Sequence, residues 1–378
     1  MKKIHTILGM ALFVVSSQPG LAVEFSLFGD MSLRDTNRDA SNHSFSIGEF
    51  DLITNQDVDD KTTLVAEIVF EDQGHGFEVD IERFRLSRTI TESIQVSAGK
   101  VHTPIGFWIW TFHHGLLLQD TVTRPFFLDF EDTHSGIFPT HAVGAFVTGE
   151  HNTESYNLDY TLGIASTSSI DSTSEEHVDT YELKANNFQD PATDKSFTSR
   201  VGLSSADHRL GVGLSYMHSL ISESADPDAD ALPENQPLLD RGGILFEQKI
   251  AVVDFRYRND WFYLLSEYYH MSIDDNKGIN NARYTPNPDT YNADAYYAQL
   301  GIYMGSKFTL SLRHEFFKHD ANAGYFTLLG IKETTRNVAA LRYNFSENNA
   351  LILESARNEI KGGDSFNQYE LQWLFLIL

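Results

Sequence analysis

One stretch of this sequence concentrates side chains that could bind a metal ion. Histidine and carboxylate are ligands that zinc takes in proteins. Their spacing between residues 102 and 140 matches no standard ligand motif, so we favour a second interpretation. In it, these polar groups line a narrow passage or hydrogen-bond to its wall, and neither a metal nor a cofactor is predicted. The groups are His102, His113, His114 and His134, with His141 just beyond, and Asp120, Asp129, Glu131 and Asp132.

A second pattern, His314-Glu315 followed by His319, resembles a zinc-protease motif but has one residue too many. On a strand, residues five apart face opposite sides, so these two histidines cannot converge on one ion. The sequence has no G-x-S-x-G elbow, no Walker loop and no G-x-G-x-x-G. We therefore predict no enzyme activity. A hydrolase stays open, because a Ser/His/acid site assembled across strands leaves no local signature.

The N-terminal residues predict a cleaved secretory signal over 1–22. Lys2 and Lys3 give a positive start, residues 7–15 form an apolar run, and Gly20 and Ala22 are small residues before a cut. The apolar run is too short to cross a bilayer as a helix. No later stretch approaches ~20 consecutive apolar residues, so no transmembrane helix is expected.

The composition excludes some partners. The chain has 28 basic and 53 acidic residues, a formal net charge of −25, and no cysteine. Nucleic acid would be repelled at long range, so it is not an expected partner. The 27 Phe and 16 Tyr, with only 10 Pro, indicate a strand-rich chain.

After the signal, the sequence alternates between apolar and polar residues over segments of about ten residues. In the last segment Tyr369, Leu371 and Trp373 fall on one face, and Glu370 and Gln372 fall on the other. Strands that cross a membrane in a barrel have this length and this alternation. We predict sixteen strands near 24–33, 44–55, 61–71, 77–89, 92–101, 141–149, 155–165, 197–205, 209–220, 244–258, 260–272, 293–304, 307–318, 333–346, 349–358 and 367–378.

The predicted connections alternate in length. Short ones fall at 56–60, 90–91, 150–154, 206–208, Asn259, 305–306 and 346–348, and long ones fall at 102–140, 166–196, 221–243, 273–292 and 319–332. Outer-membrane barrels have short periplasmic turns and longer external loops, whereas a soluble sandwich has no reason for this rhythm. Six aromatic residues near the short turns would form an interfacial girdle: Tyr257, Trp261, Phe308, Tyr343, Phe345 and Phe375.

The strand parity also predicts a charged interior. An unpaired buried charge costs several kcal/mol, so we expect these groups to face water in a channel. They are Glu49, Asp51, Glu67, Arg83, Arg85, Asp254, Arg256, Arg258, Glu267, Arg313, Glu315, Arg336, Arg342, Glu354 and Glu370.

Two basic residues and three acidic residues in this set suggest a finer pattern. Arg83 and Arg85 form a basic row, and Glu49, Asp51 and Glu67 form an acidic row on neighbouring strands. Opposed rows would create a transverse field that favours dipolar solutes. Local neutralisation by salt bridges along the wall is an equally good interpretation.

The connection at 102–140 is too apolar for a free surface loop, and we expect Arg124 in it to bind wall carboxylates. Loops of this length without regular structure are usually functional or disordered, and the composition excludes disorder. It contains Phe107, Trp108, Trp110, Phe112, Leu116, Leu117, Leu118, Phe126, Phe127 and Phe138.

Together these features resemble the Gram-negative porins, and the stretch from Gly99 to Pro139 is loosely similar to the phosphate-selective O/P-type group. The resemblance implies a homotrimer and a third loop that folds into the lumen and narrows it. Two features depart from it. The chain ends in Leu378 where such proteins usually end in Phe, and it has no ladder of lysines, so phosphate selectivity is not carried over.

We therefore predict an all-β, 16-stranded antiparallel transmembrane barrel over 23–378, in the outer membrane of a Gram-negative bacterium. Its expected function is passive diffusion of small hydrophilic solutes, cation-leaning or weakly selective, with membrane lipid and those solutes as partners. An outer-membrane hydrolase and a receptor with a plugged barrel are the alternatives. The predicted pore-lining and constriction residues are Glu49, Asp51, Glu67, Arg83, Arg85, His113, His114, Asp120, Arg124, Asp129, Glu131, Asp132, Arg256 and Arg313.

Overall fold

The structure of the chain is a computed structural model. It describes residues 25–37, 44–72, 77–112, 116–128, 136–175, 178–184, 194–223, 244–275, 290–321 and 323–378. The predicted signal at 1–22 lies outside these residues. No helix in the described ranges is long and apolar enough to cross a membrane.

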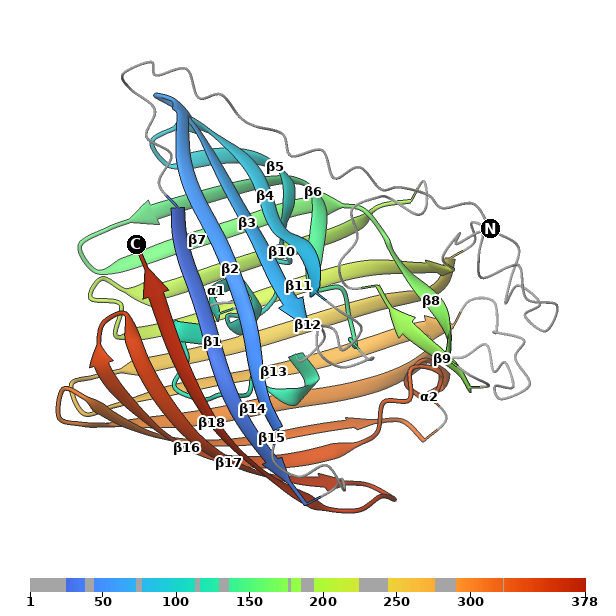
Figure 1. The fold of residues 1–378 in the computed structure, drawn as a ribbon. Helices are drawn as coiled ribbons and strands as arrows, with labels where there is room; N and C mark the ends of the chain where they lie inside the picture. The colour runs from blue at the N-terminus through green and yellow to red at the C-terminus, as the bar shows by residue number, and fades with distance from the viewer. Residues whose placement is uncertain are drawn as a thin grey trace, which may run out of the picture.

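The wall strands of the described residues form an antiparallel sheet that closes on itself (Figure 1). Each wall strand pairs with the next along the chain, β7 pairs with β10, and β1 pairs with both β2 and β18. The wall strands are β1 Phe25–Thr36, β2 Ser44–Asp59, β3 Thr62–Asp72, β4 Phe77–Thr91, β5 Ile94–His102, β6 His141–Asn152, β7 Tyr156–Ala165, β10 Ser196–Ser205, β11 Leu210–Glu223, β12 Ile244–Arg258, β13 Phe262–Asp275, β14 Thr290–Met304, β15 Phe308–His319, β16 Thr334–Ser346, β17 Asn349–Ile360 and β18 Phe366–Ile377.

The prediction of a closed barrel with sixteen wall strands is confirmed for the described residues. Each predicted strand overlaps an observed one, and each short turn lies within two residues of its expected position; the turn expected at 90–91, for example, lies between β4 and β5. The alternation of apolar and polar side chains explains the agreement, because a shift of one residue would turn the apolar side chains of a strand from the outer face to the inner face. Leu353, Leu371 and Trp373 are exposed on the outer face, whereas their neighbours Glu354 and Glu370 are buried on the inner face.

Aromatic rings gather near the short turns. The rings of Phe308 and Tyr343 lie 4.7 Å apart, those of Tyr343 and Phe345 lie 4.9 Å apart, and Phe345 continues to Trp373 at 6.4 Å. Trp261 is 76% exposed on the same rim. This band of rings is what a membrane interface favours.

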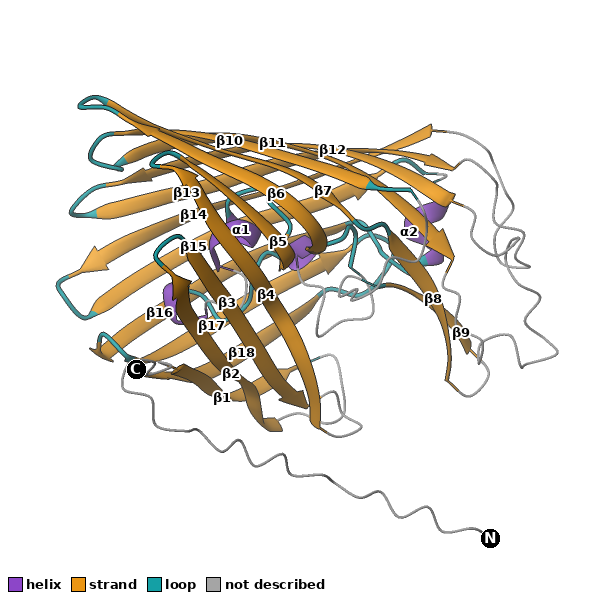
Figure 2. Cartoon of the chain, turned by 90° about the horizontal axis from the view of Figure 1, so that it is seen from above, coloured by secondary structure: helices purple, strands orange, loops and turns teal. Residues whose placement is uncertain are grey.

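Three long connections that the sequence predicts as loops contain helices or strands. The 166–196 connection forms a hairpin of β8 (Ser168–Glu175) and β9 (Val178–Leu183), and β8 also pairs in parallel with β11. The 319–332 connection contains helix α2 (Gly324–Leu328), and the 102–140 connection contains helix α1 (Trp108–Phe112). Two 3-10 turns, η1 (Leu116–Leu118) and η2 (Phe126–Leu128), follow α1. Figure 2 shows α1 within the ring of strands.

At Gly99 two paired strands of the wall approach each other very closely. Gly99 in β5 has φ +130°, and a Cβ there would lie 1.9 Å from the carbonyl oxygen of Phe84 on the paired strand. We expect Gly99→Ala to destabilise the barrel by about 3 kcal/mol or more, because the backbone must move or the pairing must break. The measurement is the urea concentration at which half of the refolded protein is unfolded. The folded fraction is read from the difference in gel mobility between the folded barrel and heated protein. The control Gly305→Ala has a positive φ in an open turn with no atom within 4 Å, and should cost about 1 kcal/mol. Equal effects of the two substitutions would contradict the close approach at Gly99.

Candidate functional site

The segment 102–140 packs its apolar side against the inner face of the wall. The ring of Trp108 lies 5.5 Å from that of Tyr297 on β14. The rings of Phe127 and Phe138 lie 5.3 and 5.8 Å from that of Tyr269 on β13. These side chains are buried, and burial of large aromatic groups is the main apolar contribution that holds the segment in place.

A single wall carboxylate holds the start of the segment. Glu267 on β13 is 1% exposed. One of its oxygens accepts hydrogen bonds from the backbone N–H groups of Phe107 (3.1 Å) and Trp108 (2.6 Å) and from the hydroxyl of Tyr297 (2.7 Å). The other oxygen accepts one from the Tyr269 hydroxyl at 2.5 Å. Four donors around one carboxylate satisfy the charge in a place from which water is excluded.

Two further carboxylates hold the later part of the segment. Glu354 on β17 accepts hydrogen bonds from the backbone N–H of Val122 (2.7 Å) and from the hydroxyl of Thr123 (2.6 Å). Glu315 on β15 accepts one from the backbone N–H of Phe126 at 2.7 Å. Both carboxylates are buried. The wall therefore satisfies backbone donors that no helix or strand pairing within the segment satisfies.

Wall arginines bond to the carbonyl groups of the same segment. Arg313 donates to the Thr123 carbonyl at 2.8 Å and to the Thr121 hydroxyl at 2.7 Å. Arg336 donates to the carbonyl of Arg124, and Arg342 to the carbonyl of Gln119. The wall thus offers carboxylates to the N–H groups and guanidinium groups to the C=O groups of one segment.

This arrangement corrects the expectation that all the inward charges face water. Glu315 is fully buried. One of its carboxylate oxygens lies 2.6 Å from Nε of Arg313 and 3.0 Å from Nε of Arg336. Charge pairs and backbone amides replace water around it, which is the condition under which buried charges are tolerated. Arg124 of the segment is likewise buried in an ion pair, with its Nη2 3.6 Å from a carboxylate oxygen of Glu49 on β2.

Some luminal arginines remain partly exposed. The side chain of Arg83 on β4 is 33% exposed although it forms an ion pair with the buried Glu67, and Arg85 two residues further is half-buried. Arg256 on β12 is 28% exposed, and its guanidinium lies 4.3 Å from the ring centre of Phe107. Asp159 on β7 is exposed on the same face.

The two predicted rows of opposite charge are therefore partly paired. Glu67 is paired with Arg83, and Glu49 with Arg124. Asp51 is fully buried. This arrangement favours local neutralisation over a free transverse field.

A cavity of about 510 Å³ lies between the start of the segment and the wall near the short turns. Aromatic, cationic and acidic side chains line it together, among them Phe107, Trp108, Tyr263, Arg256, Arg258 and Asp120. Asp120 lies 3.8 Å from Nε of Arg342. Burial raises the pKa of the Asp120 carboxyl, and the Arg342 charge opposes that rise.

The raised pKa gives a prediction for the current through the barrel. Asp120 loses its negative charge at a higher pH than an exposed aspartate does, so acidification should remove a cation-attracting charge early. We expect the cation share of the current to fall as the pH decreases from 7 to 4, and to fall less in Asp120→Asn. Reversal potentials under a salt gradient measure this share at each pH. The same pH profile in both proteins would contradict a role for Asp120.

Several predicted site residues lie outside the described residues, namely His113, His114, Asp129, Glu131 and Asp132. The parity of the strands gave the inward direction of Glu267, Glu315 and Glu354, but not their contacts with the 102–140 segment. Those contacts join residues that are about 160 to 230 positions apart in the chain, and no local pattern encodes them. One further group of buried side chains of metal-ligand type, Glu82, His102 and His141, meets at the base of the segment, where its two ends join the wall.

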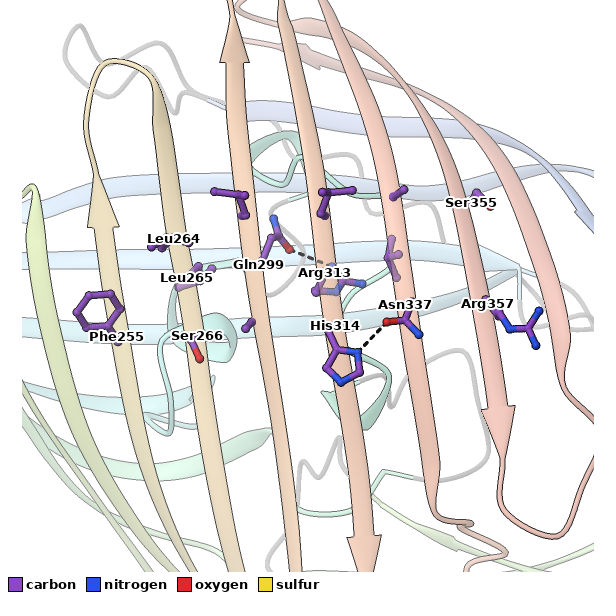
Figure 3. Close-up of a pocket in the computed structure, with 15 residues that line it drawn as sticks. Phe255, Leu264, Leu265, Ser266, Gln299, Arg313, His314, Asn337, Ser355 and Arg357 are labelled. Carbon is purple, nitrogen blue, oxygen red and sulfur yellow. Dashed lines mark hydrogen bonds between the residues drawn. The ribbon is translucent and has the colours of Figure 1, made fainter.

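A second pocket, of about 600 Å³, lies on the outer face of β12–β17 (Figure 3). His314 Nδ1 lies 2.7 Å from the amide oxygen of Asn337 there. Ser266 also lines this pocket, but β14 separates its strand from that of His314. Ser355 does so too, and β16 separates its strand from that of His314. Two strand spacings are about 9.6 Å, so neither serine can be activated by this histidine.

Comparisons with known proteins find likeness only in the fold. No family model and no curated protein matches the sequence. The anion-selective porin from Comamonas acidovorans matches with 10% identity, a TM-score of 0.59, and coverage of 94% of this chain and 99% of that one. The outer membrane channel DcaP of Acinetobacter baumannii matches with 12% identity, a TM-score of 0.58, and coverage of 96% and 99%. The trimer form of OmpT, an outer membrane protein of Vibrio cholerae, matches with 14% identity, a TM-score of 0.57, and coverage of 94% and 99%. The chain therefore shares the closed barrel fold of porins over nearly its whole length.

Proposed function

We propose that this chain is an outer-membrane porin through which small hydrophilic solutes diffuse passively. The observation that carries the proposal is the division of the barrel interior into two parts. One part is filled by the 102–140 segment, which wall charges hold in place, and the other part keeps partly exposed charged side chains. A wall that is apolar outside and charged inside suits a membrane channel.

The 102–140 segment is proposed as the constriction. Its hydrogen bonds reach β13, β15, β16 and β17, so it covers one side of the interior rather than one strand. Arg83 and Arg85 are the basic groups that we place across the remaining opening from the segment, and Asp159 is an acidic group that we place there. Arg256 lies against Phe107 on the side of the segment.

We propose weak ion selectivity. The acidic composition alone predicts a cation preference, but Glu49 and Glu67 pair with arginines, and Glu267, Glu315 and Glu354 bind the segment. The exposed charge that is left near the opening is mostly basic. Local basic groups therefore offset the attraction that the acidic chain exerts on cations.

A trimer is proposed on the likeness to OmpT, which was described in a trimer form. The hydrolase alternative loses support, because the histidine of the outer pocket has no serine on an adjacent strand within that pocket. The receptor alternative requires that the segment seal the barrel.

Planar-bilayer recording of the refolded protein tests the proposal. We expect discrete steps of constant conductance, and reversal potentials under a salt gradient that stay close to zero. Silence from protein that shows the gel shift of a folded barrel would reject the channel and favour a sealed receptor. Steps with a strong cation preference would retain the channel and reject the proposed weak selectivity.

A further inference from the structure

Two histidines and a glutamate meet where the 102–140 segment leaves and rejoins the wall. His102 ends β5 and His141 begins β6, and their Cα atoms are paired in register. The two rings lie 5.5 Å apart, edge to face. Glu82 on β4 brings a carboxylate oxygen to 2.5 Å from Nε2 of His141. All three side chains are buried, with exposures of 2 to 5%.

A β-bulge brings Glu82 into this group. Arg83 pairs with Glu67 and Ile81 pairs with Ile68, so Glu82 is an extra residue between two paired neighbours. A bulge turns consecutive side chains toward one face, and here both Glu82 and Arg83 leave the apolar outer face. Strict alternation along β4 would have directed Glu82 outward beside Phe84, which is 54% exposed.

The ligand atoms are close enough for one ion. One donor atom from each of Glu82, His102 and His141 lies within 4.8 Å of the other two. Zinc bonds of ~2.0–2.1 Å at tetrahedral angles require separations of about 3.3 Å. Rotation of the rings and the carboxylate can therefore bring the three atoms to ligand distance. Two imidazoles and one carboxylate suit zinc, cobalt and similar divalent ions better than calcium or magnesium.

The surrounding charges are compatible with a cation. Glu67 places a carboxylate oxygen 4.0 Å from Nε2 of His102 and also pairs with Arg83. Lys100 is the other nearby cationic group, and its ammonium donates to the carbonyl of Ile81 at 2.6 Å. Glu82 would thus supply a negative charge directly to a bound cation, and Glu67 lies where it could orient His102, as outer carboxylates do around metal sites.

We propose that Glu82, His102 and His141 bind a divalent transition-metal ion of the zinc class at the base of the 102–140 segment. The two ends of the segment are already joined there by a hydrogen bond from the Thr103 N–H to the Thr140 carbonyl at 2.7 Å. The ion ties both ends to β4 and stabilises the neck of the segment. This proposal does not depend on conduction through the barrel.

Zinc titration of the untagged, refolded full chain in detergent tests the site. We expect one Zn²⁺ bound per chain by calorimetry, together with a higher thermal unfolding temperature, because an ion that binds only the folded state stabilises it. Co²⁺ in place of Zn²⁺ should give visible d–d absorption typical of an ion with imidazole and carboxylate ligands. No stoichiometric binding to folded wild-type protein would overturn the proposal.

Substitutions locate the ion. We expect His141→Ala and the milder Glu82→Gln each to weaken binding by at least about tenfold and to remove the Co²⁺ absorption. The control is His218→Ala. His218 on the wall also forms a pair with a carboxylate, Glu247, at 2.8 Å, but this pair is not part of the group of Glu82, His102 and His141. This variant should bind as the wild type does. Unchanged affinity in His141→Ala and Glu82→Gln would place the ion on other histidines and overturn the assignment.

Discussion

Glu267→Ala should loosen the 102–140 segment more than any other single change to the wall. The substitution leaves the backbone N–H groups of Phe107 and Trp108 and the hydroxyls of Tyr269 and Tyr297 without their acceptor. Each unsatisfied buried donor costs about 1–3 kcal/mol, so the total loss should be roughly 4 kcal/mol or more. We expect a lower unfolding temperature, a larger and noisier single-channel current, and chymotryptic cleavage near Trp108.

The control for this prediction is Glu347→Ala. Glu347 is an exposed residue in the turn between β16 and β17, so its removal changes the net charge equally without touching the segment. It should leave the current and the protease pattern as they are in the wild type. If folded Glu267→Ala also kept the wild-type current and protease pattern, the apolar contacts of Trp108 and Phe127 and the bonds from Glu354 would hold the segment without Glu267.

Arg85→Glu should shift ion selectivity toward cations. Arg85 is half-buried on the inner face of β4, two residues from Arg83, where we propose the opening beside the segment. Reversal of its charge replaces repulsion of cations by attraction where the local dielectric is lower than in bulk water. We expect the cation-to-anion permeability ratio to rise by about threefold or more at low salt, and by less at 1 M salt, where screening is strong. Reversal potentials at two ionic strengths measure both effects.

Arg88→Glu is the matched control for this charge reversal. Arg88 lies three residues further along β4, on the opposite face, and its side chain is 55% exposed beside Asp59 at 3.4 Å. The same change of two charge units there should leave the permeability ratio close to the wild-type value. An equal shift in Arg85→Glu and Arg88→Glu would mean that net charge, not the luminal position, sets the selectivity.

The barrel could be predicted from the sequence because its rules are local. Alternation at period two fixes which side chains face outward, as in Tyr369, Leu371 and Trp373, and the alternating loop lengths fix the direction of successive strands. The inward direction of Glu267 and Glu354 follows from the same parity. The apolar composition of 102–140 likewise indicated a segment that must be buried.

Only the tertiary structure decided what these inward groups contact. Glu354 meets Val122 across 232 positions of the chain, and Glu267 meets Trp108 across 159. Barrel closure brings such residues together, and no spacing in the sequence records it.

The candidate metal site shows the same limit in another form. The sequence drew attention to His102 and His141 but suggested acidic partners within the segment, whereas the structure supplies Glu82 from β4. Glu82 faces inward because one extra residue interrupts the pairing of β3 with β4. The sequence alone thus determined the wall, its strands and the faces of their regular parts. Closure and one bulge, which depend on pairing between distant strands, determined which charges hold the segment and which side chains meet at its base.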